Sequence, residues 1–178
     1  MKLTETQLAR KDIYQGQFLN VYEDEASLPN GNTASRVVVT HPGAASVLAI
    51  TPEKKVVLVR QWRYPIGDAL LEIPAGKLDI AGEKPDECAK RELAEETPYT
   101  ATDVTLLATF YTSPGFCNEK MYVYLAENVV RNSQLNPEAD EILEPELMDA
   151  AEVRQALADN RIHDAKTWVA LQYWLLHG

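Results

Sequence analysis

A charged segment near the middle of the chain, AKRELAEETPY at residues 89–99, holds the side chains best suited to chemistry. Glu92, Glu95 and Glu96 fall within five positions, and Arg91 stands directly before them. Two carboxylates about 6 Å apart repel each other by roughly 2–3 kcal/mol at an effective dielectric constant near 20. Such a cluster is tolerated if water surrounds it, or if a cation binds there.

The spacing of these residues predicts a helix that gathers the carboxylates. Pro85 suits the first turn of a helix, so we expect the helix to run from Pro85 to about Glu96. Four residues overshoot one turn by about 40°, which stacks Glu92 with Glu96 and allows an ion pair between Arg91 and Glu95. Convergent carboxylate oxygens suit Mg²⁺ or Mn²⁺ better than zinc, which prefers nitrogen and sulfur. The alternative is a solvated acidic helix face, the commoner meaning of a glutamate pair at this spacing.

Length, composition and charge limit the classes of protein to consider. The 178 residues suit one domain with at most a short appendage, and 46% hydrophobic residues supply a core. The net charge of −10 and dispersed basic residues argue against a partner such as nucleic acid or an anionic membrane. Cys88 and Cys117 form no CxxC motif, and the sequence shows no signal peptide and no apolar run of about 20 residues. These features predict a cytoplasmic protein.

The order of predicted elements is strands, helix, strands, then helices. Turn residues at 28–31 and 51–54 predict two hairpins, one within residues 16–41 and one over 46–60. Further strands are expected within 69–78, 104–112, 120–129 and 142–148, and helices over 150–159 and 164–177. This order predicts an α/β (α+β) fold with a mixed sheet and packed helices. A boundary near residue 43 separates a small N-terminal β unit.

Residues 76–99, GKLDIAGEKPDECAKRELAEETPY, resemble the Nudix box, G-x5-E-x7-R-E-U-x-E-E-x-G-U, where U is apolar. The matching positions are Gly76, Glu83, Arg91, Glu92, Leu93, Glu95 and Glu96. Two positions depart from the pattern: six residues separate Gly76 from Glu83, and Pro98 replaces a glycine. Proline pushes the preceding residue toward extended geometry, so we expect Thr97 to end the helix in a different way from glycine.

The resemblance continues outside the box. The segments LLEIPAGKLD, YTSPGFCNE and IHDAKTWVALQYWLLH look like the ADP-ribose pyrophosphatase subfamily of Nudix hydrolases. This resemblance implies a Nudix fold at residues 44–178, with a mixed β-sheet between helices, and a small antiparallel β unit at residues 1–43 that forms a swapped homodimer. It also implies hydrolysis of ADP-ribose to AMP and ribose 5-phosphate with Mg²⁺, or Mn²⁺ as a substitute.

The resemblance further implies roles for individual residues. The metal ligands would be Glu92, Glu95, Glu96 and the carbonyl of Ala75, oriented by Gly76, Glu83 and Arg91. The catalytic base would be Glu138, Asp140 or Glu141, among which the sequence does not choose; the alternative is an acidic loop without a catalytic role. The substrate-binding residues would be Phe18, His41, Arg63, Ser113, Pro114 and Glu119. A surface position for Arg63 and a core position for Phe18 are the alternatives for those two residues.

The sequence leaves two other functions open. The first is hydrolysis of a different small-molecule nucleoside diphosphate sugar, such as ADP-glucose or a UDP- or GDP-sugar. The second is a sensor that binds ADP-ribose without cleaving it. Sensors of this kind lose acidic box residues or carry a DNA-binding appendage, whereas this chain keeps Glu92, Glu95 and Glu96. The sensor is therefore the less favoured of the two.

Overall fold

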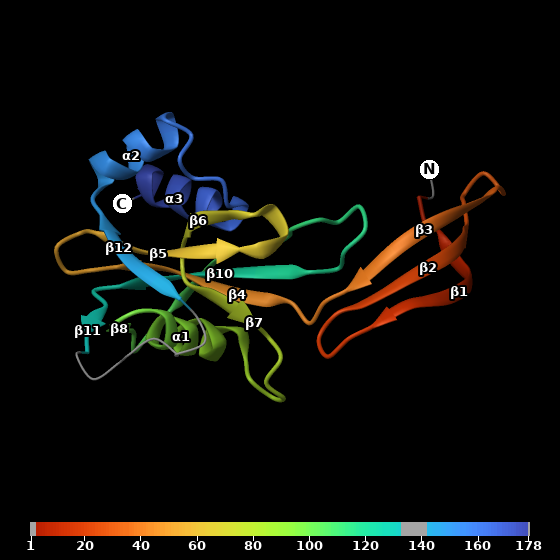
Figure 1. Ribbon diagram of the computed structural model, residues 1–178, viewed down its shortest axis with the longest axis horizontal. Helices are drawn as coiled ribbons and strands as arrows, with labels where there is room; N and C mark the ends of the chain where they lie inside the picture. The colour runs from red at the N-terminus through yellow and green to blue at the C-terminus, as the bar shows by residue number, and fades with distance from the viewer. Residues whose placement is uncertain (1–2, 133–141, 178) are drawn as a thin grey trace. The chain divides into compact units, whose positions relative to one another are not determined.

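The chain forms two compact units in the computed structural model, which describes residues 3–132 and 142–177 (Figure 1). The N-terminal unit comprises Met1–Gly43 and Phe110–Lys120, and the main unit comprises Ala44–Thr109 and Met121–Gly178. The N-terminal unit thus gathers residues 110–120 in addition to the segment that the sequence analysis set apart. Among the described residues, no helix is both long enough and apolar enough to cross a bilayer.

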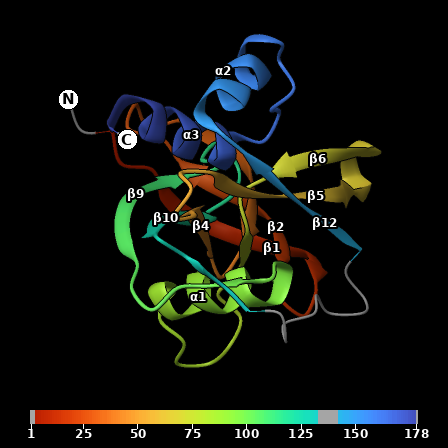
Figure 2. The ribbon, with the colours of Figure 1, turned by 90° about the vertical axis from the view of Figure 1, so that its left-hand side faces the viewer.

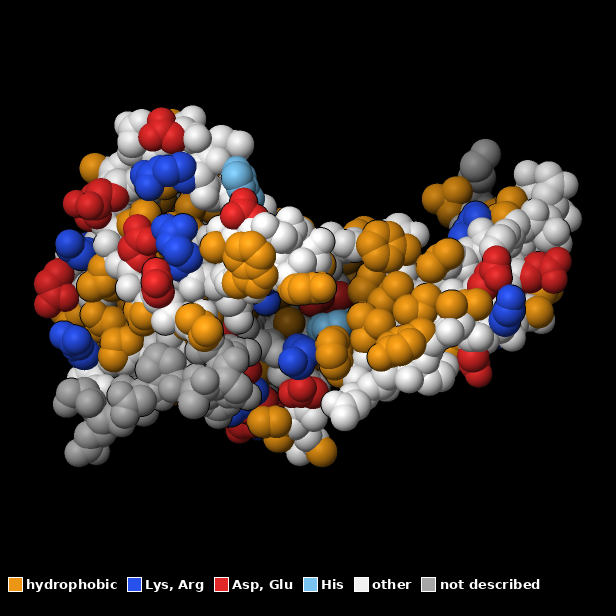
Figure 3. All heavy atoms as spheres, in the orientation of Figure 1, with side chains coloured by type: hydrophobic (Ala, Val, Ile, Leu, Met, Phe, Trp, Pro, Cys, Tyr) orange, Lys and Arg blue, Asp and Glu red, His pale blue; other side chains and the backbone are white. Residues whose placement is uncertain are grey.

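The N-terminal unit is built on an antiparallel sheet of β1 (Thr6–Gln15), β2 (Asn20–Ser27) and β3 (Thr33–Thr40). The turn between β2 and β3 lies at the predicted place, and Gly31 adopts a φ of 87° there. Strand β1 was not predicted; it is exposed along its whole length and pairs with β2. Figure 3 shows apolar side chains gathered over these strands.

The main unit contains a mixed sheet in the order β12-β5-β4-β10-β9, with β6 paired to β5 and β7 paired to β4. The strands are β4 (Ala44–Ile50), β5 (Val56–Arg63), β6 (Asp68–Glu72), β7 (Ala75–Lys77), β9 (Thr105–Tyr111), β10 (Lys120–Glu127) and β12 (Leu143–Met148). Strand β4 runs parallel to β10 and antiparallel to β5, and it is buried throughout. Short strands β8 (Tyr99–Thr100) and β11 (Val130–Arg131) pair separately, and a 3-10 turn, η1 (Tyr64–Ile66), follows β5.

Helices cover both faces of this sheet (Figures 1 and 2). Helix α1 (Pro85–Glu96) lies on one face, and α2 (Ala150–Ala158) and α3 (Ala165–His177) lie on the other. On the α1 side, Ala89 and Leu93 pack with Val47 of β4 in a fully buried cluster. The predicted α/β class, with a mixed sheet between helices, is therefore confirmed.

A buried polar cluster joins α3 to β6. Glu72, at the end of β6, accepts hydrogen bonds from Arg63 Nε and Nη2 at 2.7 Å each, and from Lys166 Nζ. Lys166 also pairs with Asp164 at 3.1 Å. Burial works against ionisation of Glu72, but the bonds from Arg63 and Lys166 outweigh it and lower the pKa of Glu72 from its usual 4.5. The cluster therefore favours the folded state when Glu72 is ionised.

We expect Glu72→Gln to lower the free energy of unfolding by about 3 kcal/mol at pH 7, because it leaves Lys166 and Arg63 without their shared carboxylate. The pKa of Glu72 is lower in the folded state than in the unfolded state, so its contribution is complete above pH 4.5. The contribution is lost as the pH falls through the folded-state pKa. Urea unfolding of both proteins over a pH series should show the gap closing in acid.

The matched control is Glu146→Gln, which removes a half-exposed carboxylate paired with Arg60 at 3.0 Å. An exposed pair of this kind contributes about 0–1 kcal/mol, so the control should change stability little at any pH. A gap between wild type and Glu72→Gln that stays constant from neutral pH into acid would contradict the role given to Glu72.

Candidate active site

Helix α1 begins and ends as its sequence dictates. Pro85 occupies the first turn, and the Lys84 N–H donates to Glu87 Oε2 at 3.0 Å, which satisfies one free amide at the start of the helix. At the other end, Thr97 is extended, with φ −140° and ψ 162°. Its N–H and its hydroxyl both donate to the Leu93 carbonyl, at 3.1 and 2.5 Å. The extended geometry predicted for the residue before Pro98 is confirmed, and Glu96 remains within the helix.

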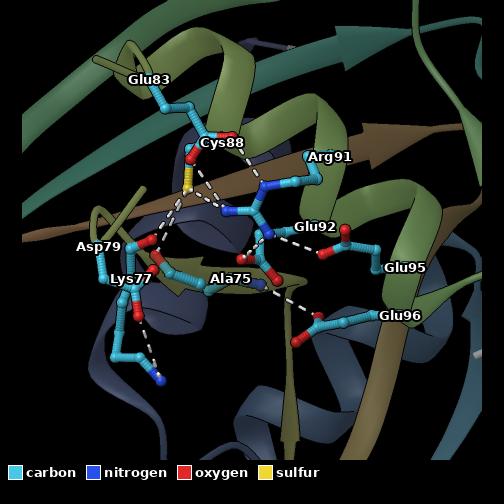
Figure 4. A network of polar contacts seen from close by, with 10 residues as sticks. Ala75, Lys77, Asp79, Glu83, Cys88, Arg91, Glu92, Glu95 and Glu96 are labelled. Atoms are coloured by element: carbon cyan, nitrogen blue, oxygen red, sulfur yellow. Dashed lines mark hydrogen bonds and ion pairs between the residues drawn. The ribbon is translucent and has the colours of Figure 1, made fainter. Parts of the chain in front are cut away.

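The guanidinium of Arg91 lies at the centre of the acidic cluster (Figure 4). Its Nε and Nη2 donate to the two oxygens of Glu83, at 2.7 and 3.0 Å. Its Nη1 donates to Glu92 Oε1 and to Glu95 Oε2, at 2.6 Å each. The hydrogen bonds to Glu83, followed by those to Glu95 and Glu92, raise the pKa of Arg91. The predicted ion pair between Arg91 and Glu95 is confirmed, and the same arginine relieves the repulsion among three carboxylates.

Gly76 makes room for the Glu92 carboxylate. Gly76 lies in β7, directly opposite α1, and a Cβ placed on it would lie 1.7 Å from Glu92 Oε1 and 1.9 Å from Glu92 Cδ. Any larger residue at position 76 would therefore push the Glu92 carboxylate from its place. The structure gives a steric reason for glycine at position 76. It also places Gly76 and Glu92, two residues of the predicted site, next to each other.

Glu96 and Ala75 form the other side of the cluster. The Glu96 side chain is buried, and its Oε2 accepts a hydrogen bond from the Ala75 N–H at 3.1 Å (Figure 4). The preceding carbonyl, that of Pro74, accepts from the Val47 N–H at 2.9 Å, which ties this turn to β4. The Ala75 backbone and the Glu96 carboxylate are thus held side by side at the end of α1.

The donor set fits a hard divalent cation, since it consists of carboxylate oxygens. The opening at Gly76, which Glu92 fills, brings one carboxylate against the β7 backbone. Within residues 3–132 and 142–177, no three acidic, histidine or cysteine side chains are arranged to hold one ion. Arg91 binds Glu92 and Glu95 instead. A cation and Arg91 would therefore compete for the same oxygens.

Cys88 borders the cluster but is not a nucleophile. Its side chain is fully buried, and its Sγ lies 3.5 Å from the Lys77 carbonyl and 3.5 Å from Arg91 Nη2. Burial, with a further contribution from the charge of Glu92, raises the pKa of Cys88 to about 12. The thiol therefore stays protonated at neutral pH and acts as packing.

Three predicted substrate-binding residues come together within the N-terminal unit. The rings of Phe18 and His41 meet edge to face, with centroids 5.8 Å apart. His41 Nδ1 accepts the Gly43 N–H at 3.1 Å, which places the ring proton on Nε2. Glu119 Oε1 lies 3.6 Å from Nδ1, and the Thr112 hydroxyl donates to the other oxygen of Glu119.

Of the remaining predicted residues, Ser113 and Pro114 belong to the N-terminal unit and Arg63 to the main unit. Ser113 begins a turn that contains Pro114, and its carbonyl accepts from the N–H groups of Phe116 and Cys117. Arg63 belongs to the main unit and is bound by Glu72. The candidates for the catalytic base, Glu138, Asp140 and Glu141, fall outside the described residues.

Sequence reasoning missed Glu72, the partner of Arg63, and Lys166, which binds the same carboxylate. One signal could have found Glu72, because it stands in the apolar run ALLEIP, where the neighbours predict burial. A buried carboxylate needs a cation, so its presence in a strand calls for a basic partner elsewhere. The sequence could not tell which lysine or arginine that partner would be.

Comparison with known proteins gives the family. The model of the NUDIX domain matches residues 40–171. An ADP-ribose pyrophosphatase of Bacillus subtilis (strain 168) is 41% identical over 172 residues, which is 96% of this chain and 92% of that protein. A methanol dehydrogenase activator of Bacillus methanolicus is 39% identical over 170 residues, 95% of this chain and 91% of that protein.

A solved structure described as an ADP compounds hydrolase superposes with a TM-score of 0.84 and covers 99% of this chain and 97% of its own. Its sequence identity is 23%, so this likeness bears on the fold. The matched domain spans the whole of β7 and α1, where Arg91 gathers the glutamates beside Gly76. The chain therefore belongs to the Nudix family of hydrolases.

Proposed function

We propose that this Nudix hydrolase cleaves the pyrophosphate bond of ADP-ribose to give AMP and ribose 5-phosphate. The observation that carries the proposal is the acidic cluster around Arg91, with Glu92 seated against Gly76 and Glu96 against Ala75. The 41% identity to an ADP-ribose pyrophosphatase over nearly the whole chain supports ADP-ribose as the substrate.

The charge of the substrate sets the chemical task. A diphosphate carries two negative charges, which must be neutralised before water can attack phosphorus. Nudix hydrolases generally use a divalent metal ion, and we propose Mg²⁺, with Mn²⁺ as a substitute, held by Glu92, Glu95, Glu96 and the Ala75 carbonyl. When bound, such an ion supplies positive charge to the phosphates and lowers the pKa of water.

The chain's own residues would then position and polarise the substrate. Arg91 and Glu83 fix the directions of the glutamate side chains, as their hydrogen bonds already do. Arg63 would bind a phosphate, since arginine forms paired hydrogen bonds to phosphate oxygens. The catalytic base is proposed among Glu138, Asp140 and Glu141.

The nucleoside end would bind in the N-terminal unit. The Phe18 and His41 rings, held edge to face, offer aromatic contact for adenine. Ser113, Pro114 and Glu119 would help to hold the same nucleoside end.

A substrate panel tests the proposal directly. Purified protein with Mg²⁺ should release AMP and ribose 5-phosphate from ADP-ribose faster than it cleaves ADP-glucose, UDP-glucose or GDP-mannose, and EDTA should abolish turnover. Mass spectrometry of the products formed in ¹⁸O-labelled water also shows which phosphorus is attacked. Preferred cleavage of another sugar nucleotide would make that compound the substrate in place of ADP-ribose. Binding of ADP-ribose without cleavage would favour a sensor function.

The position of the Glu92 carboxylate should control turnover. Glu92→Gln keeps the shape but removes the charge, and we expect it to lower kcat by about 10² or more. Gly76→Ala removes no charge, but its Cβ displaces the Glu92 carboxylate, so kcat should fall by a comparable factor. Initial rates with ADP-ribose and Mg²⁺ measure both effects.

Two comparisons show whether Gly76→Ala acts through Glu92. In the Glu92→Gln background, Gly76→Ala should cost less than about threefold, because the displaced carboxylate is already lost. Glu127→Gln, an exposed glutamate at the end of β10, should leave kcat unchanged. Near-wild-type turnover in Glu92→Gln would refute the role of this residue.

We further propose that residues 1–43 mediate a homodimer, and that this unit exchanges between subunits. Large apolar side chains of β1 and β3 are more than half exposed, among them Leu8, Ile13, Tyr14 and Val37. A small sheet of this kind needs an apolar face covered to be stable, and a second copy of the chain would cover it.

Sedimentation should give a mass of about twice the 19.9 kDa of one chain. Val37→Lys, in the exposed part of β3, should shift the population toward monomer, because a buried lysine opposes association. Leu176→Lys, at an exposed position of α3, is the matched control and should leave the dimer intact. A monomeric wild-type protein would exclude the proposed dimer.

A further inference from the structure

Lys166 occupies a position that disfavours a lysine on two grounds. It stands in the first turn of α3, where the helix dipole opposes a positive charge. It is also 7% exposed, so its ammonium group loses most of its hydration. Apolar residues of similar size commonly stabilise such a position better than buried charges do. Stability alone therefore does not explain a lysine at position 166.

The contacts of Lys166 lead to Arg63. Lys166 Nζ donates to Glu72 Oε2, which also accepts from Arg63 Nη2, while Glu72 Oε1 accepts from Arg63 Nε. Glu72 is 1% exposed and cannot reach water, so the two cations share one fixed carboxylate. The paired hydrogen bonds set both the position and the plane of the Arg63 guanidinium.

The other edge of that guanidinium binds nothing in the part of the chain that the structure describes. Within residues 3–132 and 142–177, no group accepts a hydrogen bond from Arg63 Nη1, and the Arg63 side chain is 39% exposed. The hydrogen bonds to Glu72 raise the pKa of Arg63, and the charges of Asp164 and Glu96 add to this effect. Arg63 therefore lies within electrostatic reach of Glu96, at the end of the acidic cluster.

The same segment connects both groups of residues. Ile73 follows Glu72, and its N–H donates to the Thr167 hydroxyl at 2.8 Å, which in turn donates to Asp164 at 2.6 Å. Two residues later, the Ala75 N–H donates to Glu96. A run of four residues thus links the start of α3 to a proposed metal ligand.

We propose that Glu72 and Lys166 are positioning residues that hold the Nη1 edge of Arg63 toward the diphosphate of the substrate. The proposal rests on the proposed cleavage of ADP-ribose. Glu72 fixes the guanidinium through two hydrogen bonds, and Lys166 keeps Glu72 ionised and in place from the opposite side. Neither residue touches the substrate, and both act through Arg63.

A double-mutant cycle with Arg63→Ala tests this inference. Glu72→Gln and Lys166→Met should each raise KM for ADP-ribose about tenfold while kcat changes less than about threefold, because substrate binding loses a charge-assisted hydrogen bond. In the Arg63→Ala background, neither substitution should raise KM further. Independent, multiplied effects on KM, or an unchanged KM in the single variants, would overturn the proposal.

The controls separate positioning from folding and from the choice of substrate. Arg60→Ala removes an arginine of the same strand that pairs with the half-exposed Glu146, and it should leave KM unchanged. If Glu72→Gln does not fold, Glu72→Asp keeps the charge but withdraws it from Arg63, and it enters the same cycle. Calorimetric Kd values for ADP-ribose in EDTA repeat the cycle without turnover. Binding of ADP-ribose with no hydrolysis in the presence of Mg²⁺ refutes the proposed function alone, whereas absence of binding both with Mg²⁺ and in EDTA refutes both proposals.

Discussion

The candidate active site depends on one guanidinium that holds three carboxylates. Without Arg91, Glu83, Glu92 and Glu95 would repel one another, and their side chains would turn toward water. With Arg91 in place, each carboxylate has a fixed direction, and Glu92 settles against the backbone at Gly76. The site is therefore organised before any substrate arrives, and its negative charge is already partly balanced. A cation that binds there meets carboxylates of known position in competition with an arginine.

A second guanidinium, that of Arg63, is also bound by a carboxylate, but here the carboxylate positions the arginine. Arg91 serves several acids at once, whereas Arg63 shares a single acid, Glu72, with Lys166. In the first case the arginine organises carboxylates, and in the second the carboxylate organises the arginine. The backbone between Glu72 and Ala75 joins the two clusters. Ile73 in this segment is hydrogen-bonded to α3, and Ala75 is hydrogen-bonded to Glu96.

How much of the structure could be predicted from the sequence depends on how far apart in the chain the interacting residues lie. The bounds of α1 and the pairing of Arg91 with Glu95 were predictable, because both depend on neighbours within a turn or two. Strand β1 was not, because its exposed and charged residues become a strand through pairing with β2, including the Arg10–Asp24 ion pair. The cluster of Glu72 and Lys166 joins residues 94 positions apart, and no local pattern encodes that meeting. The steric need for Gly76 likewise emerges when β7 lies against α1.

The end of α1 shows what the last position of the motif requires. Thr97 closes the final turn with its amide and its hydroxyl on one carbonyl, and the next residue is a proline. Any search pattern that insists on glycine at position 98 would pass over this chain, although the carboxylate of Glu96 is held in the last turn all the same. What the motif requires at this position is that the helix ends after Glu96. Thr97 and Pro98 end it without a glycine.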